Sequence, residues 1–174
     1  MTAPIAISAL PMQAFVGLGG NVGDVVSTLH AAIHALSGEQ AVSALRSSRL
    51  YLSQAWGPVA QDHFTNQVVE FSWSAAPEAL LEFLLSLEVR FGRQREIAQG
   101  PRTLDLDLLA VGGLQRSSDA LTLPHPRLAL RRFVLVPFAE LAPDFVIQGL
   151  GATVTTLLES CTDTSWVRPL SGSV

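Results

Sequence analysis

Two aspartates, Asp105 and Asp107, are the residues of this sequence whose type and spacing most clearly suggest chemistry. They lie in an apolar stretch, residues 103–111, whose alternation predicts a β-strand with both carboxylates on one face and leucines on the other. Two like charges on one face repel each other, and a divalent cation that also binds substrate phosphates would relieve the repulsion. The pair alone leaves a second interpretation open, a solvated acidic face on an edge strand.

The charged residues around this pair favour a polyphosphate site. The chain has eleven arginines and no lysine, and eight of the arginines lie between residues 90 and 132. Guanidinium groups bind phosphate oxygens through paired hydrogen bonds and keep their charge. Carboxylates, a metal ion and arginines together are typical of phosphoryl-transfer sites. Arg90 and Arg132 are interpreted as surface ion-pair residues, whereas Arg102 lies beside the predicted strand and is a candidate for the site.

The absence of lysine also excludes whole classes of enzyme: Schiff-base catalysts, P-loop proteins and those with a lysine general base. His125 lies between Pro124 and Pro126 on a rigid turn. A histidine fixed in this way could donate a hydrogen bond to a phosphate or transfer a proton. A purely structural role for His125 is the alternative.

Two further segments suggest contact with a ligand. The sequence GLGGN at residues 17–21 is not a dinucleotide-binding motif, because Val22 occupies the place of the last glycine. We expect it to form a glycine-rich turn in which the backbone turns sharply or approaches a ligand. Asn66 begins a predicted strand two residues after Phe64, and an amide beside an aromatic ring can bind the edge of a flat heterocycle. Capping of a turn is the alternative for Asn66.

The elements that must position these residues alternate between strands and helices without a strict βαβ rhythm. Strands are predicted at residues 14–19, 43–53, 66–73 and 103–111, and helices from Asp24, from Pro77 and near residues 154–159. The tail from Phe133 is predicted to hold a short apolar segment broken by Pro137. This pattern predicts an α+β fold, with helices packed on a mixed or antiparallel sheet.

Length and composition limit the number of domains and the kinds of partner that the protein can have. The 174 residues predict a flexible leader at 1–13 and a single catalytic domain at 14–174. A formal net charge of −4 argues against a nucleic-acid partner. Cys161 is the only cysteine, which fits a reducing compartment and predicts a cytoplasmic protein. The uncharged N-terminal residues 1–23 contain prolines and glycines and follow no basic segment, so we expect no membrane partner.

With these motifs assembled, the sequence resembles the 6-hydroxymethyl-7,8-dihydropterin pyrophosphokinase family of folate biosynthesis. The resemblance extends from about Ala14 to Ala142 and rests on the blocks GLGGN, FTNQV, GRQR, GPRTLDLDLL and TLPHPRLALRRFVLVP. It implies a monomer with a three-layer α/β/α sandwich around a ferredoxin-like sheet. It also implies transfer of the β,γ-pyrophosphoryl group of ATP to the hydroxymethyl group of 6-hydroxymethyl-7,8-dihydropterin, with release of AMP.

The resemblance also implies a role for each matching residue. Asp105 and Asp107 would hold two Mg²⁺ ions. The residues expected to bind phosphates or the nucleotide are Glu88, Arg93, Arg95, Arg102, His125 and Arg131, and of these Arg93 and Arg102 would be catalytic together with the aspartates. The residues expected to bind the pterin are Ser53, Phe64, Asn66 and Phe133.

The sequence departs from the family pattern around the arginine-rich loop. Gln99 stands where tryptophan is frequent, Glu96 where lysine is common, and Ala120 where an arginine can be found. These changes predict a working enzyme with weaker affinity for ATP. Two other classes of function stay open: a different metal-dependent phosphotransferase or phosphohydrolase that uses the same aspartates, and a non-catalytic nucleotide-binding module.

Overall fold

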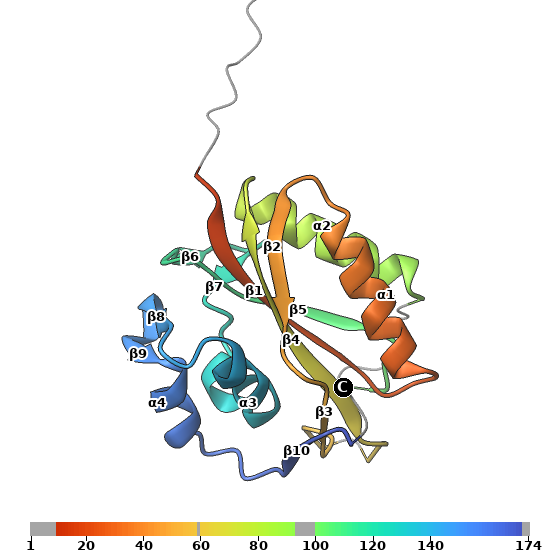
Figure 1. The fold of residues 1–174 in the computed structure, drawn as a ribbon. Helices are drawn as coiled ribbons and strands as arrows, with labels where there is room; N and C mark the ends of the chain where they lie inside the picture. The colour runs from red at the N-terminus through yellow and green to blue at the C-terminus, as the bar shows by residue number, and fades with distance from the viewer. Residues whose placement is uncertain (1–9, 59, 93–99, 172–174) are drawn as a thin grey trace, which may run out of the picture.

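An antiparallel sheet forms the centre of the molecule (Figure 1). The computed structural model describes residues 10–58, 60–92 and 100–171. The six strands of this sheet are β1 (Met12–Gly20), β2 (Val42–Ser47), β3 (Tyr51–Ser53), β4 (Phe64–Trp73), β5 (Asp105–Val111) and β10 (Val167–Pro169). Their order is β10-β3-β4-β1-β5, and β2 pairs with β4 beyond the end of β3. Every pairing in the sheet is antiparallel, so the mixed alternative is excluded for the described strands.

Helices cover both faces of the sheet and make three layers (Figure 1). The helices α1 (Val25–Ser37) and α2 (Pro77–Arg90) lie on one face, and α3 (Arg132–Leu141) and α4 (Val154–Glu159) on the other. The remaining short elements are β6 (Arg116–Ser117), β7 (Thr122–Leu123), β8 (Val146–Ile147), β9 (Ala152–Thr153) and the 3-10 turns Leu128–Leu130 and Gln148–Leu150. The order β1-α1-β2-β4-α2-β5 is that of a ferredoxin-like core, so the predicted α+β sandwich is confirmed.

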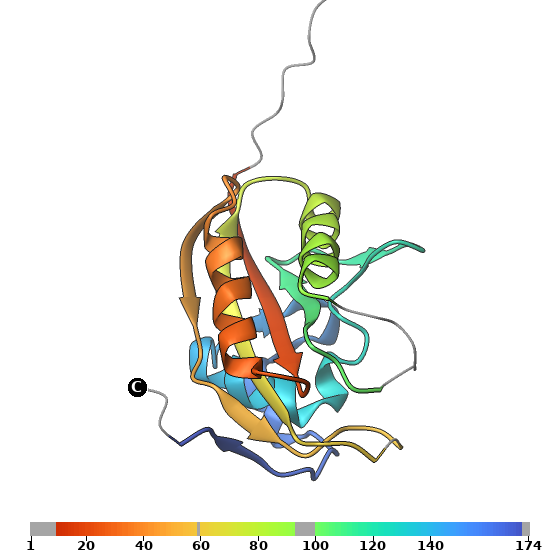
Figure 2. The same ribbon diagram turned by 90° about the vertical axis from the view of Figure 1, so that its right-hand side faces the viewer.

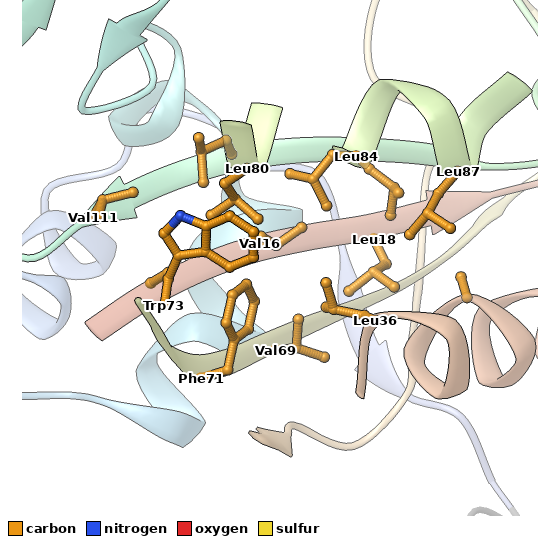
Figure 3. Packing of buried hydrophobic residues seen from close by; sticks show 14 of the residues in the cluster. Val16, Leu18, Leu36, Val69, Phe71, Trp73, Leu80, Leu84, Leu87 and Val111 are labelled. Atoms are coloured by element: carbon orange, nitrogen blue, oxygen red, sulfur yellow. The ribbon is translucent and has the colours of Figure 1, made fainter. Parts of the chain in front are cut away.

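Alternation along the strands builds a separate core on each face. Val16 and Leu18 of β1 pack with Phe71 and Trp73 of β4 against leucines of α1 and α2, such as Leu84, as Figure 3 shows. Side chains that face the other way, such as Phe15 of β1 and Val68 of β4, form a second core with α3 and α4. Because side chains of a strand alternate with a period of two, one strand supplies both cores.

Several boundaries differ from the sequence-based expectations, among them the start of β4, at Phe64 rather than Asn66, and that of β5, at Asp105 rather than Thr103. β1 begins at Met12, inside the segment assigned to the leader, because it pairs with β4 as far as Trp73. The predicted strand at residues 43–53 is two strands, separated where the Ser48 hydroxyl accepts a hydrogen bond from the Val68 backbone N–H. Pro137 does not break the tail segment but lies buried inside α3, where apolar packing outweighs one lost backbone hydrogen bond.

Two expectations overlap at the glycines at the end of β1, and the strand at residues 14–19 is confirmed, whereas the turn at residues 17–21 is wrong for the glycines. Gly17, Gly19 and Gly20 belong to the strand rather than to a turn, because they pair with β4 on one side and, for Gly17 and Gly19, with β5 on the other. Gly17 and Gly19 alternate with Val16 and Leu18, so they face the α3 side of the sheet. That part of the face therefore has no β1 side chains. None of the described helices is long and apolar enough to cross a membrane.

Candidate active site

A cavity of about 670 Å³ lies beside the glycines of β1 and the edge strand β5, lined by residues of α3 on one face of the sheet and of α2 on the other. This volume lies within the range of small-molecule sites. Ten of the twelve predicted site residues line it; the other two, Arg93 and Arg95, lie outside the described residues, as do Glu96 and Gln99. The ten are Ser53, Phe64, Asn66, Glu88, Arg102, Asp105, Asp107, His125, Arg131 and Phe133. Residues from five separate segments of the chain therefore meet here.

The strand register fixes how the two walls of the cavity face each other. Gly19 lies between Asn66 of β4 and Asp105 of β5, while Gly17 lies opposite Asp107. Neighbouring strands lie about 4.8 Å apart, so the α-carbons of Asn66 and Asp105 are separated by roughly 10 Å across a strip of glycine. We call the side that carries Asn66 the amide wall and the side that carries Asp105 and Asp107 the carboxylate wall. Gly17 and Gly19, which lie between them, form the glycine strip.

The carboxylate wall carries two close ion pairs. Asp105 and Asp107 share the face of β5 opposite Leu106, which is buried in the first core. Arg102 Nη1 lies 2.6 Å from Asp105 Oδ2, and Arg131 Nη1 lies 2.5 Å from Asp107 Oδ2. Each carboxylate is about one-quarter exposed, so both remain accessible from the cavity. The wall can bind cations through its oxygens and anions through its guanidinium groups.

His125 also faces Asp107, from the turn that follows β7. Its backbone N–H donates to the Leu109 carbonyl, and its Nδ1 accepts a hydrogen bond from the Arg127 backbone N–H at 3.1 Å. Burial lowers the pKa of His125, and this effect outweighs the opposing charge of Asp107. The neutral ring therefore carries its proton on Nε2, 3.7 Å from Asp107 Oδ1. From this position Nε2 can donate a hydrogen bond to a bound phosphate.

Arg131 connects the two walls. Its guanidinium lies over the rings of Trp56 and Phe133, with 5.3 and 5.7 Å between the guanidinium carbon and the ring centroids. Its Nε is buried and, among the described residues, has no hydrogen-bond partner. A buried N–H without an acceptor is unfavourable, and a ligand that accepts a hydrogen bond from it would remove this cost. Arg131 therefore combines an ion pair to Asp107 with a donor that is buried and, among the described residues, without a partner.

The amide wall is held by hydrogen bonds of Asn66. Its Nδ2 donates to the Ser53 hydroxyl at 2.8 Å and to the Phe64 carbonyl at 3.4 Å, and both Asn66 and Ser53 are buried. A Cβ at Gly19 would lie 3.0 Å from Asn66 Oδ1. Glycine at this position therefore leaves the amide room to meet a ligand. Phe64 and Phe133 line the cavity beside it, and aromatic faces of this kind can stack on a flat ring.

Glu88 has a positioning role that the sequence did not reveal. Its Oε1 accepts a hydrogen bond of 2.7 Å from the backbone N–H of Leu106, between the two aspartates, and the residue is 2% exposed. This bond attaches α2 to β5 at the centre of the carboxylate wall. Ala120, between β6 and β7, lines the same cavity.

Trp56, which lines the cavity, and Asn21, which holds the backbone of Arg102, are two further residues that the sequence did not reveal. Asn21 Oδ1 accepts from the backbone N–H of Arg102, and Asn21 Nδ2 donates to Gln61 Oε1 and to the Asp62 carbonyl. Asn21 thus joins the end of β1, the segment before β5 and the loop between β3 and β4. In the sequence, only the position of Asn21 directly after two glycines indicated a role for this residue. Nothing in the sequence indicated a role for Trp56, which lies in a polar loop.

Comparisons with known proteins find relatives over most of this chain. Residues 15–143 match the family model described as 7,8-dihydro-6-hydroxymethylpterin-pyrophosphokinase (HPPK). The chain is 43% identical over 180 aligned positions to the 2-amino-4-hydroxy-6-hydroxymethyldihydropteridine pyrophosphokinase of Synechocystis sp., covering 99% of this chain and 92% of that protein. It is 36% identical to the Pseudomonas aeruginosa protein of the same description, over 86% and 91% of the two chains.

Solved structures are similar in fold. The HPPK-DHPS of Plasmodium falciparum superposes with a TM-score of 0.65 and 14% identity, covering 88% of this chain and 44% of that chain. This chain thus spans less than half the length of that protein.

Proposed function

The chain belongs to the 7,8-dihydro-6-hydroxymethylpterin-pyrophosphokinase family, and on this premise we propose that it transfers the β,γ-pyrophosphoryl group of ATP to 6-hydroxymethyl-7,8-dihydropterin. The products are AMP and the dihydropterin pyrophosphate of folate synthesis. One observation carries the assignment to this cavity: the register of β4, β1 and β5 places an amide wall and a carboxylate wall on either side of a glycine strip. One wall suits a heterocycle and the other a polyphosphate.

The amide wall would bind the pterin. Asn66, held by Ser53, presents an amide to the donor and acceptor edge of the ring. Phe64 and Phe133 would stack on the ring faces, and Trp56 would close the pocket from the loop between β3 and β4. A pterin bound here would direct its hydroxymethyl group across the glycine strip toward β5.

The carboxylate wall would bind the triphosphate. The hard oxygens of Asp105 and Asp107 suit Mg²⁺, which characteristically takes one or two protein carboxylates together with substrate phosphates. Two Mg²⁺ ions held there would neutralise negative charge on the triphosphate when bound. Arg102, His125 and Arg131 line the same space and supply donors for phosphate oxygens, and Arg131 Nε is buried without a partner among the described residues.

Positioning would supply most of the rate. The hydroxymethyl oxygen is a weak nucleophile, and its proton could pass to a carboxylate of the wall. Fixed guanidinium groups would stabilise the charge that develops on the transferred group and on the leaving AMP. Arg93 and Arg95 keep their predicted role as additional phosphate-binding residues, outside the described residues. The monomeric state, the cytoplasmic location and the weaker ATP affinity likewise stay predictions.

The test is to incubate the protein with ATP, Mg²⁺ and 6-hydroxymethyl-7,8-dihydropterin and to separate the nucleotide products. We expect AMP only when the pterin is present, and no product after EDTA treatment until Mg²⁺ is restored. ADP in place of AMP would indicate single phosphoryl transfer and contradict the proposal. Turnover that persists in excess EDTA would contradict the metal requirement.

A further inference from the structure

The segment after α4, residues 160–170, contacts both sides of the pterin half of the cavity; we call it the C-terminal strap. It lies beyond the residues matched by the family model. From α4 it passes α3 and ends as β10 against β3 (Figures 1 and 2). Val167 lies opposite Ser53 in this pairing, and the Leu170 backbone N–H donates to the Leu50 carbonyl at 2.8 Å. The strap is therefore anchored at both ends.

The strap first fixes the start of α3. Asp163 Oδ2 accepts a hydrogen bond of 3.1 Å from the backbone N–H of Arg132, and its Oδ1 accepts one from Ser165. Arg132 lies between Arg131 and Phe133, the two cavity residues of this helix end. The N-cap residue of α3 makes no side-chain cap hydrogen bond. The carboxylate of Asp163 takes its place: it accepts the hydrogen bond of a free N–H in the first turn, and its negative charge stabilises the positive end of the helix.

The strap then fixes the loop between β3 and β4. The Trp166 carbonyl accepts a hydrogen bond of 3.3 Å from the Gln54 backbone N–H, at the start of this loop. The Trp166 indole meets the His63 ring edge-on with centroids 4.8 Å apart, at the end of the same loop. The loop carries Trp56 and leads directly into Phe64. Trp166 thus contacts both ends of this loop, whose described residues, 54–58 and 60–63, form no helix or strand.

We propose that the C-terminal strap sets the separation of the two pterin-binding sides, with Asp163 and Trp166 as its positioning residues. The inference rests on the proposed function. Stacking of a flat ring between Phe64 and Phe133 depends on that separation, so a displacement of either side weakens the binding of the ring. Asp105 and Asp107 lie on β5, at the opposite edge of the sheet from β10. Loosening the strap at Trp166 should therefore weaken pterin binding more than ATP binding, whereas loosening it at Asp163 also disturbs Arg131, which pairs with Asp107.

The test compares Trp166→Ala with wild type by steady-state AMP formation and by calorimetric titration of the pterin in the presence of Mg²⁺ and a non-transferable ATP analogue. We expect the KM and Kd for the pterin to rise about tenfold, with the KM for ATP and kcat close to wild type. Trp166→Phe should restore most of the affinity, because its ring can still meet His63. Asp163→Ala should also raise the pterin KM, and Asp163→Asn, which keeps an acceptor oxygen, should do so less.

Thr153→Ala is the matched control. It removes the N-cap hydrogen bond of α4 to Thr156, and it leaves both pterin-binding sides untouched. We expect a lower melting temperature and an unchanged pterin KM. If Trp166→Ala and Asp163→Ala behave like Thr153→Ala, the strap is only structural and the inference is overturned. A wild-type protein that binds no pterin would instead overturn the proposed function and the inference together.

Discussion

At the scale of single residues, each aspartate of β5 depends on the cation that faces it. Asp105 pairs with Arg102, three residues earlier, whereas Asp107 pairs with Arg131, which lies 24 positions later. Without these partners two carboxylates on one strand face would repel each other. The same guanidinium groups give the wall its capacity for phosphate. The two functions of the wall, binding cations and binding anions, are therefore carried by the same ion pairs.

Asp107→Asn tests this arrangement, because it keeps the volume of the side chain and removes its charge. We expect turnover to fall by roughly 100-fold or more, since the phosphate-side charge balance is lost. Pterin binding, measured by titration, should remain close to wild type because Asn66 and the aromatic rings lie on the other wall. Asp119→Asn, at an exposed position, is the control and should retain full turnover. If Asp107→Asn kept full activity, the negative charge of Asp107 would have no role in catalysis.

At the scale of elements, the close approach of β1 to the segment before β5 decides where Arg102 lies. The Asn21 backbone N–H donates to the Arg102 carbonyl, and the Asn21 side chain accepts from the Arg102 N–H. This approach requires glycine at position 20: a Cβ there would lie 2.6 Å from the Thr103 carbonyl oxygen and 3.3 Å from that of Arg102. Backbone atoms cannot move aside singly, so any larger residue must shift the whole segment.

Gly20→Ala should therefore reduce activity through a displacement of Arg102. We expect kcat/KM for ATP to fall at least about tenfold, because the guanidinium would no longer lie beside Asp105. Gly38→Ala is the matched control: Gly38 has a φ of −82°, and a Cβ there would meet its nearest neighbours at 3.6 and 3.7 Å. Its activity should be unchanged. Equal kinetics for the two variants would show that the approach of the two segments does not matter for catalysis.

At the scale of the whole molecule, the two cores are joined through the central sheet. Phe15 of β1 packs on Phe138 of α3 with ring centroids 4.5 Å apart, while its neighbours Ala14 and Val16 belong to the core under α1 and α2. A disturbance of either core therefore reaches the strand that carries the glycine strip. We expect the described fold to lose its stability as one unit.

Phe138→Ala tests this coupling. Removing a fully buried ring should lower the free energy of unfolding by about 3–5 kcal/mol. In urea titrations followed by far-UV circular dichroism and by tryptophan fluorescence, the two signals should still change in a single coincident transition. Leu150→Ala, at a residue that is 44% exposed, should change the stability by less than about 0.5 kcal/mol. Two separate transitions for Phe138→Ala would show that the α3 and α4 layer unfolds independently.

The sequence alone determined the features that depend on local periodicity. Alternation placed Asp105 and Asp107 on one face of a strand, and the concentration of arginines around them pointed to phosphate. The same local signals placed the glycines of β1 in a turn, because a glycine-rich run resembles a turn until its neighbours on both sides are known. They also gave no role to Asn21 or Trp56.

Only the tertiary structure decided which residues face each other across the glycine strip. The register that sets Asn66 opposite Gly19 and Gly19 opposite Asp105 joins strands far apart in the chain. Arg131 meets Asp107 because α3 packs through Phe138 on the sheet, and the C-terminal strap reaches the pterin side because β10 pairs with β3. Local backbone preferences act over a few residues, whereas these contacts are set by the burial of two cores against one sheet.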